Sequence, residues 1–138
     1  MMIQESIEIR TNGRATLEIT REVDAIVRQS GITTGLCHVF IHHTSASLMI
    51  TENADSNVQR DLEAYMARLV RDGDPAYIHD QEGPDDMAAH IRSVLTLTDL
   101  SVPIQSGQLA LGTWQGLFLW EHRYHPHRRR VTVTLSGE

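Results

Sequence analysis

Apolar and polar residues alternate in the first part of the chain. The alternation covers residues 7–10 and returns over residues 15–19, with Asn12-Gly13 between the two stretches. A period of two residues is typical of a strand that buries one face, and Asn-Gly is a strong signal for a tight turn. We therefore expect two strands joined by a hairpin at Asn12-Gly13.

Two later segments have the period of an amphipathic helix. The first covers residues 21–30, with Thr20 as the expected N-cap and Gly31 as a left-handed C-cap. The second runs from Ser56 to about Val70, and Ser56-Asn-Val-Gln59 offers a capping box. Its apolar stripe, which we expect to face the core, contains Val58, Leu62, Tyr65, Met66, Leu69 and Val70.

The densest group of ionisable side chains lies beside a third expected helix, in residues 77–90. Pro84 suits the first helical position, and Asp85 and Asp86 then fall in the first turn, where the helix dipole favours negative charge. Asp86 and His90 are four residues apart and share a face. The adjoining apolar stripe contains Met87, Ile91, Val94 and Leu95. The segment is either a site or only a helix with a solvated acidic first turn.

The rest of the chain has the pattern of strands. A buried strand is expected from about Leu36 to His43, and the segment Ser101–Ile104 is extended because the residue before Pro103 avoids the helical region. A turn follows at Gln105-Ser-Gly107. Further strands are expected at residues 47–52, 109–111, 117–123 and 131–135. Strands with three helices among them indicate an α+β domain on a mixed or mostly antiparallel sheet.

Length and composition limit the class of protein. The 138 residues, of which 41% are hydrophobic, fit one domain covering residues 1–138. The formal charge of −6 argues against non-specific nucleic-acid binding. No apolar run is long enough for a signal peptide or a membrane span, which predicts a soluble, cytoplasmic protein without a membrane partner. Cys37 is the only cysteine and lies in an apolar stretch, so we expect a core residue.

His43 is a candidate ligand because of its place on a strand. Side chains alternate, so His43 shares a face with Val39 and Ile41, whereas His42 shares the other face with Phe40. A histidine where a buried strand runs into a Thr/Ser loop is well placed to bind a metal or an anion. The alternative is a histidine that only satisfies a backbone carbonyl.

Glu121 is a second candidate, because it lies on the face defined by Leu117 and Leu119. Burial there would raise its pKa unless a cation or metal is near, and such acids are enriched at functional sites. The alternative is that the strand has already reached solvent at Glu121.

Two loops carry weaker signals. The segment Gly112–Gly116 presents a hydroxyl, an indole and a carboxamide between two glycines, although hairpins also use glycine for steric reasons alone. The segment 122–130 offers His125 and His127 to a metal or its arginines to a phosphate, but an exposed charged loop has the same composition.

In combination, these motifs resemble those of the YjbQ family, an uncharacterised-protein family also labelled secondary thiamine-phosphate synthase. The resemblance runs nearly end to end. The segments that carry it are His43-Thr-Ser-Ala46, Glu52-Asn-Ala-Asp55, the block from His79 to His90, Gly107-Gln-Leu-Ala-Leu-Gly-Thr-Trp-Gln-Gly116 and Glu121.

The resemblance implies an α+β domain that assembles as a homotrimer, with a polar cleft containing His43, His79 and His90 and the acid Glu121. It also implies a weak ability to join a pyrimidine diphosphate to a thiazole phosphate. Family members often continue after the glutamate with an aromatic residue, an acidic turn and Pro-Arg, whereas this chain has His122-Arg-Tyr-His-Pro-His-Arg128.

We consider three hypotheses for function. The first is an enzyme of small phosphorylated or anionic substrates with thiamine-phosphate synthase-type transferase activity, in which Glu121, Asp86 and His79 are catalytic. The residues expected to position its substrate are Thr44, Ser45, Asn53, Gly112, Thr113, Trp114 and Gln115. The others are a non-catalytic trimeric module that binds a metal or metabolite, and a hydrolase that uses metal-activated water.

A divalent metal is the expected cofactor. His43, His79 and His90 would make an open site for zinc or a similar metal. Transfer from pyrophosphate instead calls for magnesium, which Glu82, Asp85 and Asp86 would hold together with substrate phosphates.

Overall fold

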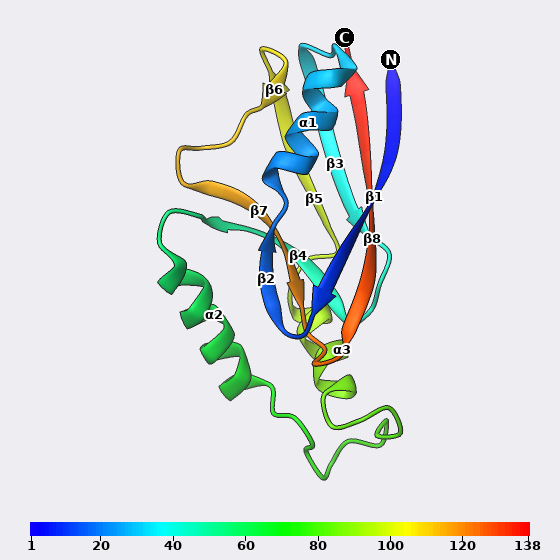
Figure 1. Ribbon diagram of the computed structural model, residues 1–138, viewed down its shortest axis with the longest axis vertical. Coiled ribbons are helices and arrows are strands. Elements are labelled where there is room, and N and C mark those ends of the chain that lie inside the picture. The colour runs from blue at the N-terminus through cyan, green and yellow to red at the C-terminus, as the bar shows by residue number, and fades with distance from the viewer.

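The computed structural model describes residues 1–138 and contains two antiparallel sheets (Figure 1). The larger sheet has the order β1-β8-β3-β5-β6, and the smaller one has the order β2-β7-β4. The strands are β1 (Met2–Asn12), β2 (Ala15–Glu18), β3 (Thr34–Ile41), β4 (Ala46–Glu52), β5 (Asp99–Gln105), β6 (Gln108–Leu109), β7 (Gln115–Glu121) and β8 (Pro126–Gly137). The helices are α1 (Thr20–Ser30), α2 (Ser56–Leu69) and α3 (Asp86–Leu95). The predicted α+β class, three helices and antiparallel pairing are confirmed.

The main core lies between the two sheets and under α1. It contains 19 buried residues, and the alternate apolar positions of β3, β7 and β8 all point into it. Cys37 is fully buried among them, as predicted, and burial raises the pKa of its thiol to about 12. The thiol is therefore protonated at neutral pH and acts as an apolar core residue.

The expected hairpin at Asn12-Gly13 is wrong, although the chain does turn there. β1 pairs with β8 over its whole length, whereas β2 pairs with β7 in the other sheet. Gly13 has φ +107° and lies against the backbone carbonyl of Tyr124, so the chain bends sharply enough to change sheets. The Asn-Gly signal correctly predicts a turn, because a turn depends on neighbouring residues. It does not predict that β1 and β2 pair with strands far along the chain.

The first two helices begin differently from the prediction. Thr20 is the first helical residue rather than the N-cap, and its hydroxyl donates to Glu18 and accepts from the Leu117 N–H. In α2 the N-cap is Asp55, which accepts from the Asn57 N–H, so the capping box at Ser56 does not form. The left-handed C-cap at Gly31 is confirmed.

α2 lies against the smaller sheet, apart from the main body (Figure 1). Met66 and Val70 pack into a second, smaller core with Phe118 and Trp120 of β7. Tyr65 and Leu69 of the predicted stripe are exposed. Only part of the predicted apolar stripe of α2 is therefore buried within one chain.

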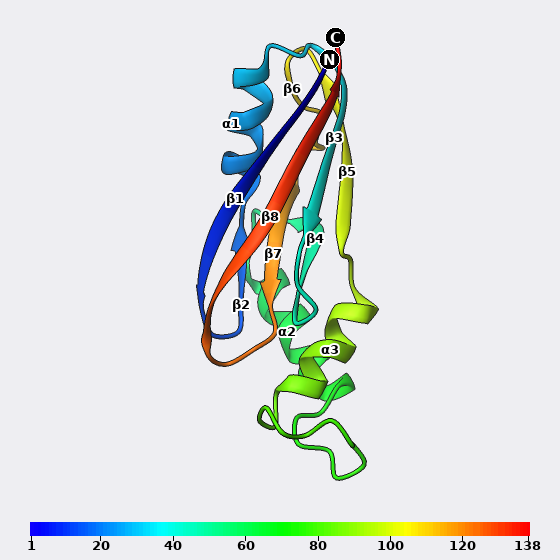
Figure 2. The same ribbon diagram turned by 90° about the vertical axis from the view of Figure 1, so that its right-hand side faces the viewer.

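α3 lies at the end of the molecule with the long loop before it (Figure 2). It begins at Asp86, so Pro84 stands before the N-cap residue Asp85 and not at the first helical position. The first half of the predicted stripe is confirmed, because Met87 and Ile91 are partly buried and Ile91 packs against the smaller core. The second half is wrong, because Val94 is 84% exposed and Leu95 is 56% exposed. The buried face carries Ala88, Ala89 and Arg92 instead.

Arg92 explains this rotation of α3. Its guanidinium is buried and donates to Glu63 of α2, while the small Ala88 and Ala89 permit close packing. The orientation of α3 therefore buries an ion pair with α2 in place of the last residues of the apolar stripe. No helix of the chain is both long and apolar enough to span a lipid bilayer.

The remaining strands agree with the pattern, with longer bounds for β8. The β5–β6 turn uses Ser106 and Gly107, both with positive φ, as the predicted turn requires. β8 extends from Pro126 to Gly137 because it pairs with β1 on one side and β3 on the other.

Candidate functional site

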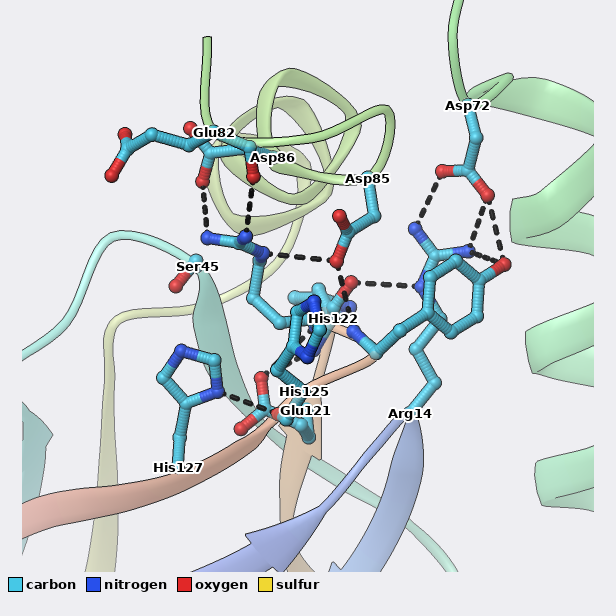
Figure 3. Close-up of polar contacts among 12 residues, drawn as sticks. Arg14, Ser45, Asp72, Glu82, Asp85, Asp86, Glu121, His122, His125 and His127 are labelled. Carbon is cyan, nitrogen blue, oxygen red and sulfur yellow. Dashed lines mark hydrogen bonds and ion pairs between the residues drawn. The ribbon is translucent and has the colours of Figure 1, made fainter.

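The candidate site lies where the loop of residues 71–85 meets the start of α3 and the β7–β8 turn. A hydrogen bond from the Gly73 N–H to the Pro84 carbonyl closes the loop at its base. Asp72 ties its first residues to Arg14 and Tyr124. Figure 3 shows Glu82, Asp85 and Asp86 on one side of this region and Glu121 and His122 on the other.

His79, Asp86 and His90 form the centre of the site. Asp86 Oδ2 lies 2.8 Å from His79 Nε2 and 3.3 Å from His90 Nε2. The predicted contact between Asp86 and His90 is confirmed, and His79 reaches the same oxygen from the loop. Asp86 is buried, whereas the two imidazoles are partly open to solvent. Three potential metal ligands, all within 4.8 Å of one another, thus face an accessible space.

The hydrogen bonds of His90 define what can lie between the three groups. His90 Nδ1 is 3.0 Å from the Thr44 carbonyl oxygen, which can only accept, so Nδ1 carries the proton. In the neutral ring, His90 Nε2 then presents a lone pair to Asp86. That contact is favourable only when a proton or a metal cation lies between the two atoms.

The spacing of the three groups also fits a metal. Ligand atoms at about 2.0–2.1 Å from a metal lie roughly 3 Å from one another. A ligating histidine also commonly donates its other ring N–H to a backbone carbonyl, as His90 does to Thr44. Two imidazoles and one carboxylate with open positions form a recurring metal-binding set.

Arg123 orients the carboxylates at the start of α3. Its Nε donates to Asp85 Oδ2 at 2.9 Å, and its NH1 donates to Asp86 Oδ1 at 2.7 Å. Its NH2 donates to the Glu82 carbonyl. Asp86 therefore has one oxygen on Arg123 and the other on the two histidines.

Both aspartates are held ionised. Burial would raise the pKa of Asp86, but the hydrogen bond from His79, the nearby His90 imidazole and the charge of Arg123 outweigh it, so its pKa lies below the usual value. Burial opposes ionisation of Asp85 too, and hydrogen bonds from the Tyr124 N–H and Arg123 again lower its pKa. The site is anionic before any cation binds.

The structure does not bring His43 into this cluster. His43 Nε2 accepts a hydrogen bond from the Arg130 N–H at 2.8 Å, and Nδ1 lies 3.4 Å from Arg129. Burial and the charge of Arg129 lower its pKa. β3 ends at Ile41, two residues before the predicted end, so His42 and His43 lie in the loop after it, with His42 exposed and His43 half-buried. The candidate metal ligands that lie together are His79, Asp86 and His90, without His43.

Glu121 is fully buried and paired, so the alternative of a solvent-exposed strand end is wrong. Its carboxylate accepts two hydrogen bonds from Arg129 and one from Thr11. Burial would raise its pKa, but these partners together with the Arg123 N–H lower it. The cation that a buried carboxylate was expected to need is Arg129. Because Glu121 is fully buried, a substrate cannot reach it in this chain.

Two of the predicted substrate-binding residues lie close to the site. Thr44 accepts from His90 through its carbonyl, and Ser45 is buried on Arg129. A groove of about 500 Å³ opens beside His90. It is lined by Phe40, Ile41, His42, His43, Thr44, His90, Ser93, Val94 and Thr98.

The other predicted substrate-binding residues lie elsewhere. Gly112, Thr113 and Trp114 precede β7 and Gln115 begins it, so the length of this strand separates them from Glu121 by about 20 Å. Asn53 joins this loop, because its N–H donates to the Trp114 carbonyl. One chain therefore does not gather both sets into one site.

Sequence reasoning missed the basic partners of the site. The arginines of segment 122–130 were considered only as phosphate ligands, whereas Arg129 binds Glu121 and Arg123 binds the aspartates of α3. Arg92 of α3 was assigned no role. A carboxylate on an aliphatic strand face was the one available signal, since it requires a cation. His125 and His127 form no metal cluster, and the His127 imidazole donates from Nδ1 to the His125 carbonyl.

Comparison with known proteins places the whole chain in one group. The UPF0047 protein YjbQ-like family matches residues 5–138. A UPF0047 protein of Synechocystis sp. is 53% identical over 135 residues, covering 98% of this chain and 92% of the relative. YjbQ of Salmonella typhimurium is 42% identical, with 100% of both chains covered.

Solved structures agree with this result. An uncharacterised YjbQ/UPF0047 protein from Clostridium acetobutylicum is 34% identical with a TM-score of 0.85, covering 97% of this chain and 99% of that one. A hypothetical protein from Aeropyrum pernix has a TM-score of 0.90 at 26% identity, with 99% of both chains covered. The fold, the motifs and the full-length match agree, and the chain belongs to the YjbQ/UPF0047 family.

Proposed function

We propose that this protein is an enzyme of small phosphorylated or anionic metabolites that uses a divalent metal. The observation that carries the proposal is the convergence of His79, Asp86 and His90 on one accessible space. Histidine and carboxylate atoms at this spacing, with one histidine oriented through a backbone carbonyl, are costly to assemble for structural reasons alone.

His79, Asp86 and His90 would hold the metal. When bound, it would supply a positive charge that stabilises developing negative charge on a substrate or leaving group. Asp86 keeps its place because Arg123 holds its second oxygen, and Thr44 orients His90. These contacts would keep the two imidazoles aligned before substrate binds.

The groove beside His90 supports an anionic substrate. The chain has 18 acidic residues, yet no carboxylate lines this groove. Three imidazoles and the hydroxyl side chains of Thr44, Ser93 and Thr98 provide hydrogen-bonding groups there. Its volume of about 500 Å³ suits a small metabolite.

The family resemblance suggests the reaction, thiamine-phosphate synthase-type transfer with release of pyrophosphate. In our proposal Asp86 and His79 act on the reacting groups through the metal that they would hold, and Glu121 instead positions Arg129 and the Ser45 loop. We also propose the cytoplasmic location and the homotrimer that the sequence suggests.

Metal binding is tested by elemental analysis of protein purified without a histidine tag. We expect stoichiometric metal in the wild type and its loss in His90→Ala and Asp86→Asn. His42→Ala is the matched control, because His42 is exposed and bonds only to Thr132. No metal in the wild type, or undiminished metal in His90→Ala, would end the proposal.

Activity is tested by product formation from the pyrimidine diphosphate and the thiazole phosphate, with and without added magnesium. We expect weak turnover that His79→Ala reduces by about 10²-fold or more, because the loss of a metal ligand should cost at least as much as the loss of a partner that orients one. Wild-type turnover in His79→Ala would assign the activity to another site or to a contaminant.

A hydrolase is the second candidate, because three protein ligands leave a coordination position for water. Release of inorganic phosphate from a simple phosphate monoester, without a second substrate, would favour it. A metal-loaded trimer without turnover on either substrate would favour a non-catalytic binding module.

A further inference from the structure

Arg123 connects the end of β7 to the start of α3. Its three hydrogen bonds reach Asp85, Asp86 and the Glu82 carbonyl, which all lie within residues 82–86 at the start of the helix. The guanidinium is itself largely buried, and both aspartates are buried with it. Since a planar guanidinium presents its donors in a rigid fork, the position of one carboxylate is coupled to the other.

This clamp limits the oxygens that a metal could use. Asp86 Oδ1 and Asp85 Oδ2 both accept from Arg123, and Asp85 Oδ2 also accepts from the Tyr124 N–H. Only Asp86 Oδ2 is turned toward His79 and His90. The three groups that lie within 4.8 Å of one another therefore offer two imidazole nitrogens and a single carboxylate oxygen, while the Glu82 carboxylate lies 3.6 Å from His79 Nε2.

This donor set discriminates between metals. Magnesium prefers six oxygen ligands in octahedral geometry and is usually held by carboxylates and phosphates. Zinc and similar metals accept imidazole readily, with three protein ligands and one open position. The magnesium arrangement expected from Glu82, Asp85 and Asp86 is disfavoured, because Arg123 already binds one oxygen of each aspartate.

We propose that Arg123 determines the metal class of the site. By holding Asp86 to one free oxygen, it makes the site four-coordinate and selective for zinc-class cations over magnesium. This inference rests on the proposed function, which requires a divalent metal but not a particular class. Arg123 acts through Asp86 and is a positioning residue.

The test uses cobalt(II) as a spectroscopic substitute for zinc in the full-length protein. Four-coordinate cobalt absorbs strongly in the visible range, whereas six-coordinate cobalt absorbs weakly. We expect the strong spectrum in the wild type, unchanged by excess magnesium. Lysine keeps the charge but cannot bridge two carboxylates, so Arg123→Lys should bind cobalt about 10- to 100-fold more weakly and lose the strong absorption.

Two further variants separate positioning from folding. Asp85→Asn keeps the Arg123–Asp86 contact, so it should lose stability but keep the strong cobalt spectrum. Arg71→Gln is the control, because the Arg71 side chain makes no hydrogen bond or ion pair. If Arg123→Lys does not fold, the unchanged spectrum of Asp85→Asn and the magnesium competition still decide the question.

The outcomes separate this inference from the proposed function. Wild-type affinity and spectrum in Arg123→Lys, or a weak six-coordinate spectrum in Asp85→Asn, would overturn the role of Arg123. Displacement of cobalt by magnesium would overturn the selectivity while leaving a metal enzyme. A wild-type protein that binds no divalent cation would end both proposals.

Discussion

Buried charged side chains of this protein each face a partner of opposite charge. Glu121 pairs with Arg129, and Asp85 and Asp86 pair with Arg123. Such a pair need not stabilise a protein relative to apolar residues, but removal of one partner leaves a buried charge alone. The stability of the folded chain around these pairs therefore requires both partners of each pair to be present.

Glu121→Gln should destabilise the protein by about 3–5 kcal/mol, because it leaves Arg129 buried beside a neutral amide. Urea denaturation followed by circular dichroism measures the free energy of unfolding. The double variant Glu121→Leu with Arg129→Met should lose less than the sum of the two single variants. Strict additivity would show that the pair does not interact as described.

At the scale of elements, helix starts depend on which side chain reaches the free backbone N–H groups. α2 begins at Ser56, but Asp55 accepts the hydrogen bond from the Asn57 N–H. Gln59, the expected partner in a capping box, donates instead to the Glu52 carbonyl of β4. The end of the preceding strand thus decides how the helix starts.

Asp55→Ala should cost about 1 kcal/mol of stability, because an N-cap acceptor is lost. Ser56→Ala, one residue later, should change the free energy of unfolding by only a few tenths of a kcal/mol, since it removes no cap. Thermal and urea unfolding of the two variants give the comparison. Equal losses of unfolding free energy in the two variants, or a larger loss for Ser56→Ala, would show that Ser56 is the N-cap and that the capping box forms.

At the scale of the whole molecule, groups from distant segments make stability depend on pH. His122 is buried between β7 and the helices, and its pKa is lowered to about 3, first by burial and then by Arg92, Arg14 and Arg129. The unfolded histidine has a pKa of about 6.5. Below that value the unfolded chain takes up a proton that the folded chain excludes, so stability falls as the pH falls.

The carboxylates add to this effect at lower pH. The pKa values of Asp72, Asp85, Asp86 and Glu121 are lowered in the folded protein, so their stabilisation is present above about pH 4 and is lost below it. The folded state should therefore be most stable near neutral pH. The window from pH 6.5 to 4.5 reports mainly on histidine.

His122→Phe should flatten the stability curve in that window, where one proton contributes up to about 1.4 kcal/mol per pH unit. His43, whose pKa is also lowered, should leave a residual slope. Urea midpoints measured from pH 4.5 to 7.5 test this. A slope equal to that of the wild type would mean that His122 is not held neutral.

The sequence by itself determined features that depend on neighbours along the chain. Alternation placed Cys37, Val39 and Ile41 on the buried face of β3 and Phe40 on the other, and helical spacing brought Asp86 next to His90. These predictions hold because strand and helix periods are properties of the local backbone.

Only the tertiary structure decided which distant groups meet. The turn at Gly13 is local, but the partners of β1 and β2 depend on which apolar faces close the core. The arginines of the site are the clearest case, because Arg123 reaches residues that lie 37 and 38 positions earlier in the chain. A buried carboxylate requires a cation wherever it lies, but which arginine supplies it follows from long-range packing, which a local pattern does not contain.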